Sequence, residues 1–210
     1  MPFNPKSFIA ACLLMSVPTL ATTVWRTHET LGNNFTLAAF NNTLSNANFT
    51  GAPLVLGSAD ANTVPNVSEH NPGAIDGESF YLSSTYYSYP YNEYPSLGLV
   101  NGNLRAFDGG GNWHTNASVP FLGYEALSWA TSTLYSDPAP TAFSAATIPA
   151  SVYPVLAVNG VYDMWYLCPS DERLGQDSVY YNTTFIGSSK GSLSTRISCY
   201  SVTLNMVPVQ

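Results

Sequence analysis

Two Asn-Gly dipeptides constrain the fold of this chain more than any other feature of its sequence. Asn101-Gly102 and Asn159-Gly160 lie in the apolar segments "LGLVNGNLRAF" and "VLAVNGVYDMWYL". Both central residues of a two-residue type I′ turn need positive φ angles, which Asn and Gly tolerate. The sequence therefore predicts a β-hairpin at each dipeptide. The shared Val-Asn-Gly is compatible with duplicated hairpins in one sheet system, but the match is too short to show a repeat.

The rest of the chain is typical of short strands separated by turns. It contains 15 glycines, 15 prolines and 14 tyrosines, and it has little helical periodicity. The last segment alternates most clearly, with apolar residues on one face and polar residues on the other. Strands are expected at residues 79–82, 85–89, 127–135, 178–186 and 199–207. Residues 137–154, rich in proline and alanine, indicate a loop with at most one helical turn.

These features together predict an all-β fold. We expect a single antiparallel β-sandwich domain, with a β-trefoil or a small barrel as the alternative. The domain divides into a glycosylated N-terminal part, residues 22–77, and a main all-β region with one disulfide, residues 78–210.

The N-terminus has the three parts of a secretory signal peptide. Lys6 precedes the apolar run "FIAACLLMSV", and small residues follow at Thr19 and Ala21. The run is shorter than the about 20 residues of a membrane span. We therefore assign residues 1–21 to a signal peptide, with a buried N-terminal helix as the alternative, and expect a secreted, extracellular or cell-wall protein. The ending "NMVPVQ" offers no hydrophobic tail for a membrane anchor.

Charge is scarce in this chain. Only 9% of the residues are charged, the formal net charge is −7, and the few Lys and Arg residues are scattered. Nucleic-acid binding needs clustered cations and is excluded as a function class. Six N-x-[ST] sequons offer another source of solubility, because N-linked glycans are bulky and hydrophilic. The expected glycosylation sites are Asn34, Asn41, Asn48, Asn66, Asn116 and Asn182.

Two cysteines, Cys168 and Cys199, follow the signal peptide. In an oxidising compartment they most simply form one disulfide. Closing a loop of about 30 residues should stabilise the fold by about 3–4 kcal/mol. A free thiol or a metal site is the alternative, although neither cysteine has a neighbouring Cys or His ligand.

Catalytic and metal-binding motifs are incomplete. Residues 187–191 read G-x-S-x-G, but no Asp, Glu or His follows Ser189 to complete a hydrolase triad. His28, His70 and His114 lack metal-ligand spacing, so no metal or cofactor is expected. A glycoside hydrolase, the alternative to a non-enzymatic protein, would need two carboxylates. The candidates are Glu69, Asp76, Glu78, Glu93, Asp108, Glu125 and Asp163, and no spacing favours a pair.

Aromatic residues are the remaining candidates for a binding site. Tyr87, Tyr89 and Tyr91 would share one face of a strand, and with Trp113 they are the candidate glycan-stacking residues. Burial of these rings in the core is the alternative. Trp113 follows three consecutive glycines in "FDGGGNWHTNAS", which lacks the Gly-Lys-Ser/Thr ending of a phosphate-binding loop.

Taken in order, these segments resemble the fungal secreted cell-wall proteins of the phialide-development (PhiA) type. The resemblance spans residues 78–207 and rests on "SFYLSSTYYSY", "AFDGGGNW", "FLGY", "LSWAT", "YLCPS", "SVYYN" and "CYSVTLNMV". It implies an extracellular, wall-associated protein of fungal development, and it carries over no catalytic residues. It also implies that the triple glycine forms a turn between strands, with Asp108 bracing it.

We therefore expect a secreted, N-glycosylated fungal cell-wall or extracellular protein without catalytic activity. Its expected partners are wall polysaccharide or wall proteins. A lectin-like module using the tyrosines or Trp113 is the second hypothesis, and a secreted hydrolase with an unrecognised carboxylate pair is the third. A freely secreted effector fits the same sequence.

Overall fold

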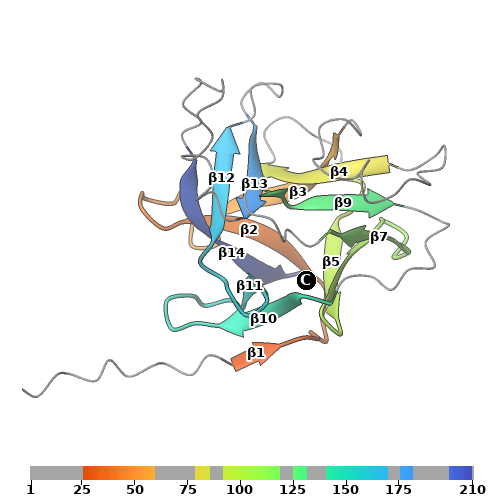
Figure 1. Ribbon diagram of the computed structural model, residues 1–210, viewed down its shortest axis with the longest axis horizontal. Helices are drawn as coiled ribbons and strands as arrows, with labels where there is room; N and C mark the ends of the chain where they lie inside the picture. Colours follow the sequence, from red (N-terminus) through yellow and green to blue (C-terminus); the bar gives the residue numbers. More distant parts are fainter. Residues whose placement is uncertain are drawn as a thin grey trace, which may run out of the picture.

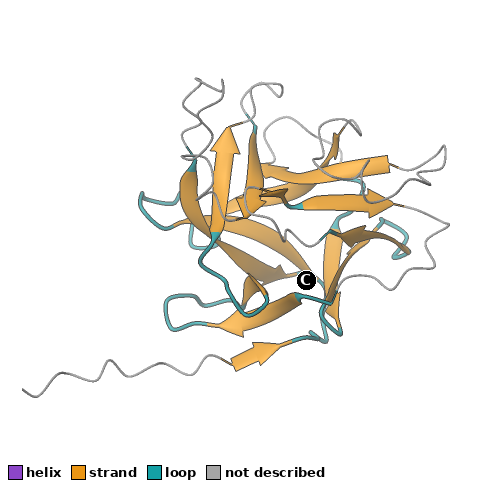
Figure 2. Ribbon diagram, viewed as in Figure 1, coloured by secondary structure: helices purple, strands orange, loops and turns teal. Residues whose placement is uncertain are grey.

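The computed structural model describes residues 26–59, 79–85, 92–118, 125–131, 141–169, 176–181 and 199–209. Every regular element within these ranges is a β-strand (Figures 1 and 2). The strands are β1 (Arg26–His28), β2 (Phe35–Asn41), β3 (Ala52–Ala59), β4 (Ser79–Thr85), β5 (Ser96–Val100), β6 (Asn103–Phe107), β7 (Trp113–Ala117), β8 (Glu125–Ala126), β9 (Ser128–Thr131), β10 (Phe143–Thr147), β11 (Val155–Val158), β12 (Trp165–Pro169), β13 (Asp177–Tyr181) and β14 (Tyr200–Pro208).

Six of these strands close into a barrel. They follow the order β14, β12, β13, β4, β3 and β2, and β2 pairs with β14 to complete the ring. All of these pairings are antiparallel, and the closing ladder runs from Val202 opposite Asn41 to Pro208 opposite Phe35. The all-β, antiparallel prediction is confirmed. The closed ring corresponds to the small-barrel alternative rather than to two stacked sheets.

Further strands extend the barrel on both sides. β5, β6, β7 and β9 lead from β2 back to β4, which forms a second closed path, and β8 pairs with β13. From β14 the sheet continues through β11 and β10 to β1, which lies at the edge in Figure 1. Closed paths leave few unpaired strand edges.

The core fills the space between these strands with aliphatic and aromatic side chains. Trp129 and Trp165 are both fully buried, and each indole N–H has an acceptor. Trp129 Nε1 donates to Ser83 Oγ at 2.8 Å, and Trp165 Nε1 donates to the Leu156 carbonyl at 2.9 Å. A buried indole that satisfies its N–H retains the full benefit of its apolar burial.

Both Asn-Gly turns have the predicted geometry. The φ angles are 50° at Asn101 and Asn159, 74° at Gly102 and 79° at Gly160. The first turn joins the full hairpin of β5 and β6. The hairpin predicted at the second turn was wrong beyond the turn itself, which is flanked by a single bridge between Val158 and Val161. The next strand, β12, pairs with β13 and β14 instead of β11.

Of the other strand predictions, some are confirmed, and others fall partly outside the described residues. β4, β9, β13 and β14 lie where strands were expected, while residues 86–89, 132–135 and 182–186 are outside the described residues. The loop prediction for residues 137–154 was wrong in its middle, where β10 pairs with β1 and β11. Alanine by itself disfavours a strand, but the small side chains of the β10 alanines are buried there, so tertiary packing decides.

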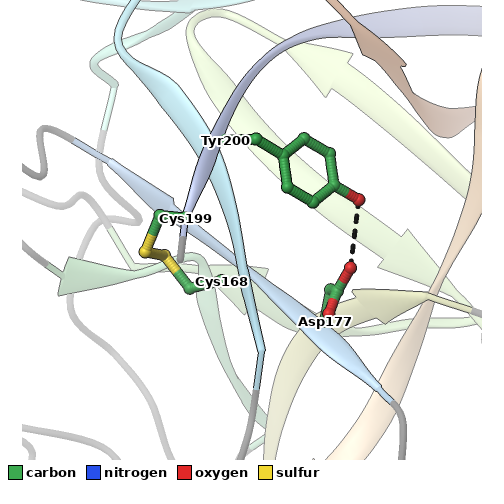
Figure 3. Close-up of a disulfide and its surroundings, with 4 residues drawn as sticks. All are labelled: Cys168, Asp177, Cys199 and Tyr200. Atoms are coloured by element: carbon green, nitrogen blue, oxygen red, sulfur yellow. Dashed lines mark hydrogen bonds between the residues drawn. A yellow bond between two sulfur atoms is a disulfide. The ribbon is translucent and has the colours of Figure 1, made fainter. Parts of the chain in front are cut away.

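The disulfide prediction is confirmed. Cys168 and Cys199 are bonded, with their Cα atoms 4.2 Å apart. The last pair in the ladder of β12 and β14 is Leu167 opposite Tyr200, and the two cysteines come directly after this pair. Figure 3 shows the bond where β12 ends and β14 begins, so it fastens β14 to the barrel at the start of that strand.

The two Asn-Gly turns provide a matched test of close packing. A Cβ at Gly102 would lie 2.5 Å from the Thr141 carbonyl oxygen, whereas a Cβ at Gly160 would meet nothing within 4 Å. Both substitutions to Ala carry the strain of a positive φ, about 1–2 kcal/mol. Gly102→Ala should lower the free energy of unfolding by a further about 1–3 kcal/mol because of the overlap. Urea denaturation of both variants measures the difference, and equal losses would contradict the packing argument.

Candidate functional site

Several predicted site residues lie outside the described residues. These are the stacking candidates Tyr87, Tyr89 and Tyr91, the sequon residues Asn66 and Asn182, and the G-x-S-x-G segment at 187–191. Several of the described candidates lie on two surfaces. One surrounds Trp113 and the other surrounds the sequons at Asn41 and Asn48.

The triple glycine forms the turn between β6 and β7, and Asp108 braces it. The backbone N–H groups of Gly110 and Asn112 each donate to Asp108 Oδ1 at 2.8 Å. Asn112 Nδ2 contacts both oxygens of the same carboxylate, at 3.2 and 3.0 Å. Gly111 has a φ of 78°, which a glycine adopts without strain. The expectation that this loop is a turn braced by Asp108 is confirmed.

This turn presents Trp113 next to a cation. The Arg105 guanidinium carbon lies 3.6 Å from the centroid of the Trp113 ring, which is within cation–π distance. Trp113 Nε1 donates to Asn116 Oδ1 at 3.1 Å, and Arg105 Nε donates to Asn103 Oδ1 at 2.8 Å. Burial lowers the pKa of Arg105 from its ordinary value. We call Arg105, Trp113 and Asn116 the Trp113 platform.

Trp113 differs in exposure from the two tryptophans of the core. Trp113 is 40% exposed, whereas Trp129 and Trp165 are fully buried. Arg105 and Asn116 lie opposite each other in the ladder of β6 and β7, so both partners of the indole come from rigid strands. An indole fixed on two sides loses little further side-chain entropy when a ligand packs against it.

The second surface is a groove of about 680 Å³. It lies between the 42–51 loop and the 148–152 turn, beside the polar face of β14. Its lining contains five asparagines, several hydroxyl and apolar side chains and no charged residue, so we call it the neutral groove. Phe49 stacks on Tyr153 with ring centroids 6.2 Å apart.

The polar floor of the neutral groove is paired within the protein. Asn205 Nδ2 donates to the Thr50 carbonyl at 2.8 Å, and Ser151 Oγ donates to Asn205 Oδ1 at 2.9 Å. Thr203 Oγ1 donates to Asn42 Oδ1 at 2.9 Å. Thr203 and Asn205, the polar face of β14, are consequently buried under the loop and the turn rather than exposed to solvent.

The four described sequons differ in their surroundings. Asn41 and Asn48 form side-chain turns in the 42–51 loop and line the neutral groove. Asn34 Nδ2 donates to Ser96 Oγ at 3.2 Å, and Asn116 belongs to the Trp113 platform. These asparagines could be predicted from their N-x-[ST] spacing in the sequence. The groove could not, because it depends on the approach of the 42–51 loop to the 148–152 turn.

Among the described residues, no three His, Cys, Asp or Glu residues gather as a metal site would require. Of the candidate carboxylates, Asp108 accepts hydrogen bonds from the backbone of the turn between β6 and β7. Glu69, Asp76 and Glu78 lie outside the described residues. The described residues form no helix that is long and apolar enough to cross a membrane.

The largest pKa shift among the described residues belongs to Tyr200, which follows Cys199 of the disulfide. Tyr200 donates its hydroxyl to Asp177 Oδ2 at 3.0 Å (Figure 3). Burial, followed by the negative charge and hydrogen bond of Asp177, raises the pKa of Tyr200 to about 12. Burial and then Asp163 raise the pKa of Tyr181 as well. Both shifts keep the phenols neutral and fit structural roles.

The Tyr200 shift predicts alkaline sensitivity of the fold. The pKa of Tyr200 is about 12 in the folded state and about 10 in the unfolded state. The neutral phenol therefore contributes its full stabilisation to the fold below about pH 10, and this stabilisation is lost as the pH rises toward about 12. The urea midpoint should therefore fall between about pH 9 and about pH 11.5. Tyr200→Phe should reduce that fall. An identical fall in the variant would assign the alkaline sensitivity to other groups.

Comparison of the chain with protein-family models, with curated proteins and with solved structures found no match. The function is therefore argued from the two surfaces described above and from the sequence.

Proposed function

We propose that this chain is a secreted, N-glycosylated cell-wall or extracellular protein without catalytic activity, which associates with neutral wall polysaccharide through the Trp113 platform. The observation that carries the proposal is the half-exposed indole of Trp113, held by Arg105 and Asn116. The signal peptide expected from the sequence, together with the disulfide, supports an oxidising, extracellular compartment.

The chemistry of the platform suits a carbohydrate. An indole ring packs its apolar face against the C–H face of a sugar, and neighbouring amide and guanidinium groups supply hydrogen bonds to hydroxyls. Arg105 lies on the strand beside the ring, and the buried side chain of Asn103 holds its guanidinium in place. The platform is therefore an amphipathic surface that needs no rearrangement before a sugar binds.

The charge of the chain narrows the class of polysaccharide. The formal net charge is −7, so a polyanionic polymer would be repelled over most of the surface. Uncharged polymers such as β-glucan and chitin carry no such penalty. We therefore propose a neutral wall polysaccharide rather than an acidic one.

A binding assay with matched aromatic variants tests this function. Protein produced without N-glycans is applied to insoluble β-glucan and to chitin, so that Asn116 remains an amide and retention cannot come from the protein's own glycans. Trp113→Ala should reduce retention severalfold on the polymer that binds. Phe49→Ala removes another exposed ring, which belongs to the neutral groove, and should leave retention unchanged.

The outcomes separate the candidate surfaces. Unchanged retention of Trp113→Ala would reject the platform, and loss only in a Tyr87, Tyr89 and Tyr91 triple Ala variant would place binding in the tyrosine row. Equal losses in Trp113→Ala and Phe49→Ala would indicate non-specific adhesion. Retention on whole wall but on neither polymer would favour a protein partner.

A further inference from the structure

The three most exposed large apolar side chains of the described residues gather at the neutral groove. Leu44 is 70% exposed, Phe49 is 71% exposed and Val152 is 88% exposed. All three line the groove. A cluster of exposed apolar side chains generally marks a surface that something covers.

Two sequons on this groove fold in the same way. Asn41 Oδ1 accepts hydrogen bonds from Thr43 N at 2.8 Å, Thr43 Oγ1 at 3.0 Å and Leu44 N at 2.9 Å. Asn48 Oδ1 accepts the equivalent bonds from Thr50 N at 3.1 Å, Thr50 Oγ1 at 2.8 Å and Gly51 N at 2.8 Å. In both turns the threonine of the sequon contacts the asparagine that would carry the glycan.

This geometry leaves the attachment atom available. Every side-chain hydrogen bond that these two asparagines form within the described residues uses Oδ1, and N-glycosylation modifies Nδ2. An N-linked glycan therefore preserves all six bonds. The contrast is Asn34, whose Nδ2 already donates to Ser96 Oγ.

The polarity and the size of the neutral groove suit a sugar that is attached at its edge. Its floor amides are already paired with the protein, so few polar groups remain to recognise a diffusing ligand. Its outer part presents Leu44, Phe49 and Val152 and carries no charge. Its volume of about 680 Å³ lies within the about 300–1,000 Å³ typical of small-ligand sites, which gives room for the first sugars of a glycan.

We propose that Asn41 and Asn48 carry N-glycans whose first N-acetylglucosamine residues lie in the neutral groove and cover Leu44, Phe49 and Val152. The apolar face and acetyl group of the sugar pack on the Phe49 ring, and the glycans hold the 42–51 loop against the 148–152 turn. The groove is thus an intramolecular glycan site, distinct from the Trp113 platform. The inference rests on the secretion assumed in the proposed function.

The test uses the full chain secreted from a eukaryotic host. Site-resolved mass spectrometry gives the occupancy of each sequon, and hydroxyl-radical footprinting gives the solvent access of Leu44 and Phe49. The comparison variant is Asn41→Asp/Asn48→Asp, because a carboxylate keeps the Oδ1 acceptor of both turns while removing both glycans. Thr43→Ser/Thr50→Ser keeps both sequons and hydroxyls and is the matched control.

We expect occupancy at Asn41 and Asn48, and oxidation of Phe49 that is severalfold faster in the Asp variant than in the wild type. The oxidation rate of Trp113 should be the same in both, which makes it the internal reference. If the Asp variant does not fold, enzymatic removal of the glycans from the folded wild type provides the same comparison.

Two results would overturn the inference. One is glycosylation at other sequons with Asn41 and Asn48 unoccupied. The other is occupancy of both sites with equal oxidation of Phe49 before and after glycan removal, which would mean that the glycans project into solvent. Absence of secretion and of glycans at every sequon would instead contradict the proposed function, so the two failures are distinguishable.

Discussion

The ladder between β2 and β14 is the constraint on which the rest of this structure depends. It joins segments from opposite ends of the described chain and closes the six-stranded ring. β14 also pairs with β12 and β11, and the disulfide fastens its first residues to β12. Both surfaces depend on this closure. The neutral groove lies over the polar face of β14, and β5, which leads to the Trp113 platform, pairs with β2.

Scarcity of charge gives asparagine the structural roles that ion pairs often have elsewhere. Asn42 and Asn205 tie the 42–51 loop to neighbouring strands, and Asn116 orients the Trp113 ring. Amides both donate and accept hydrogen bonds without the desolvation penalty of a charge. A chain that is 9% charged can therefore bury its polar groups at a low desolvation cost. Its surface needs another source of solubility, which the proposed glycans would supply.

The two surfaces divide the proposed roles between them. In Figure 1 the 42–51 loop lies to the left of the barrel and the β6–β7 turn lies to the right. One surface has polar groups that are satisfied internally and an apolar rim beside two sequons. The other has a rigid, half-exposed indole with a cation against it. The first suits a permanent, covalently attached sugar, and the second suits a polymer that binds reversibly.

The sequence by itself determined the local features that depend on one or two residues. The positive φ angles of Asn101 and Asn159, the brace of Asp108 and the pairing of Cys168 with Cys199 all follow from residue chemistry or simple counting. Barrel closure, the strand at 143–147 and the neutral groove were decided only by tertiary structure. The physical reason is that strand partners and buried faces are set by contacts between distant segments. Alternation along one strand shows that it has two faces, but not what will cover each of them.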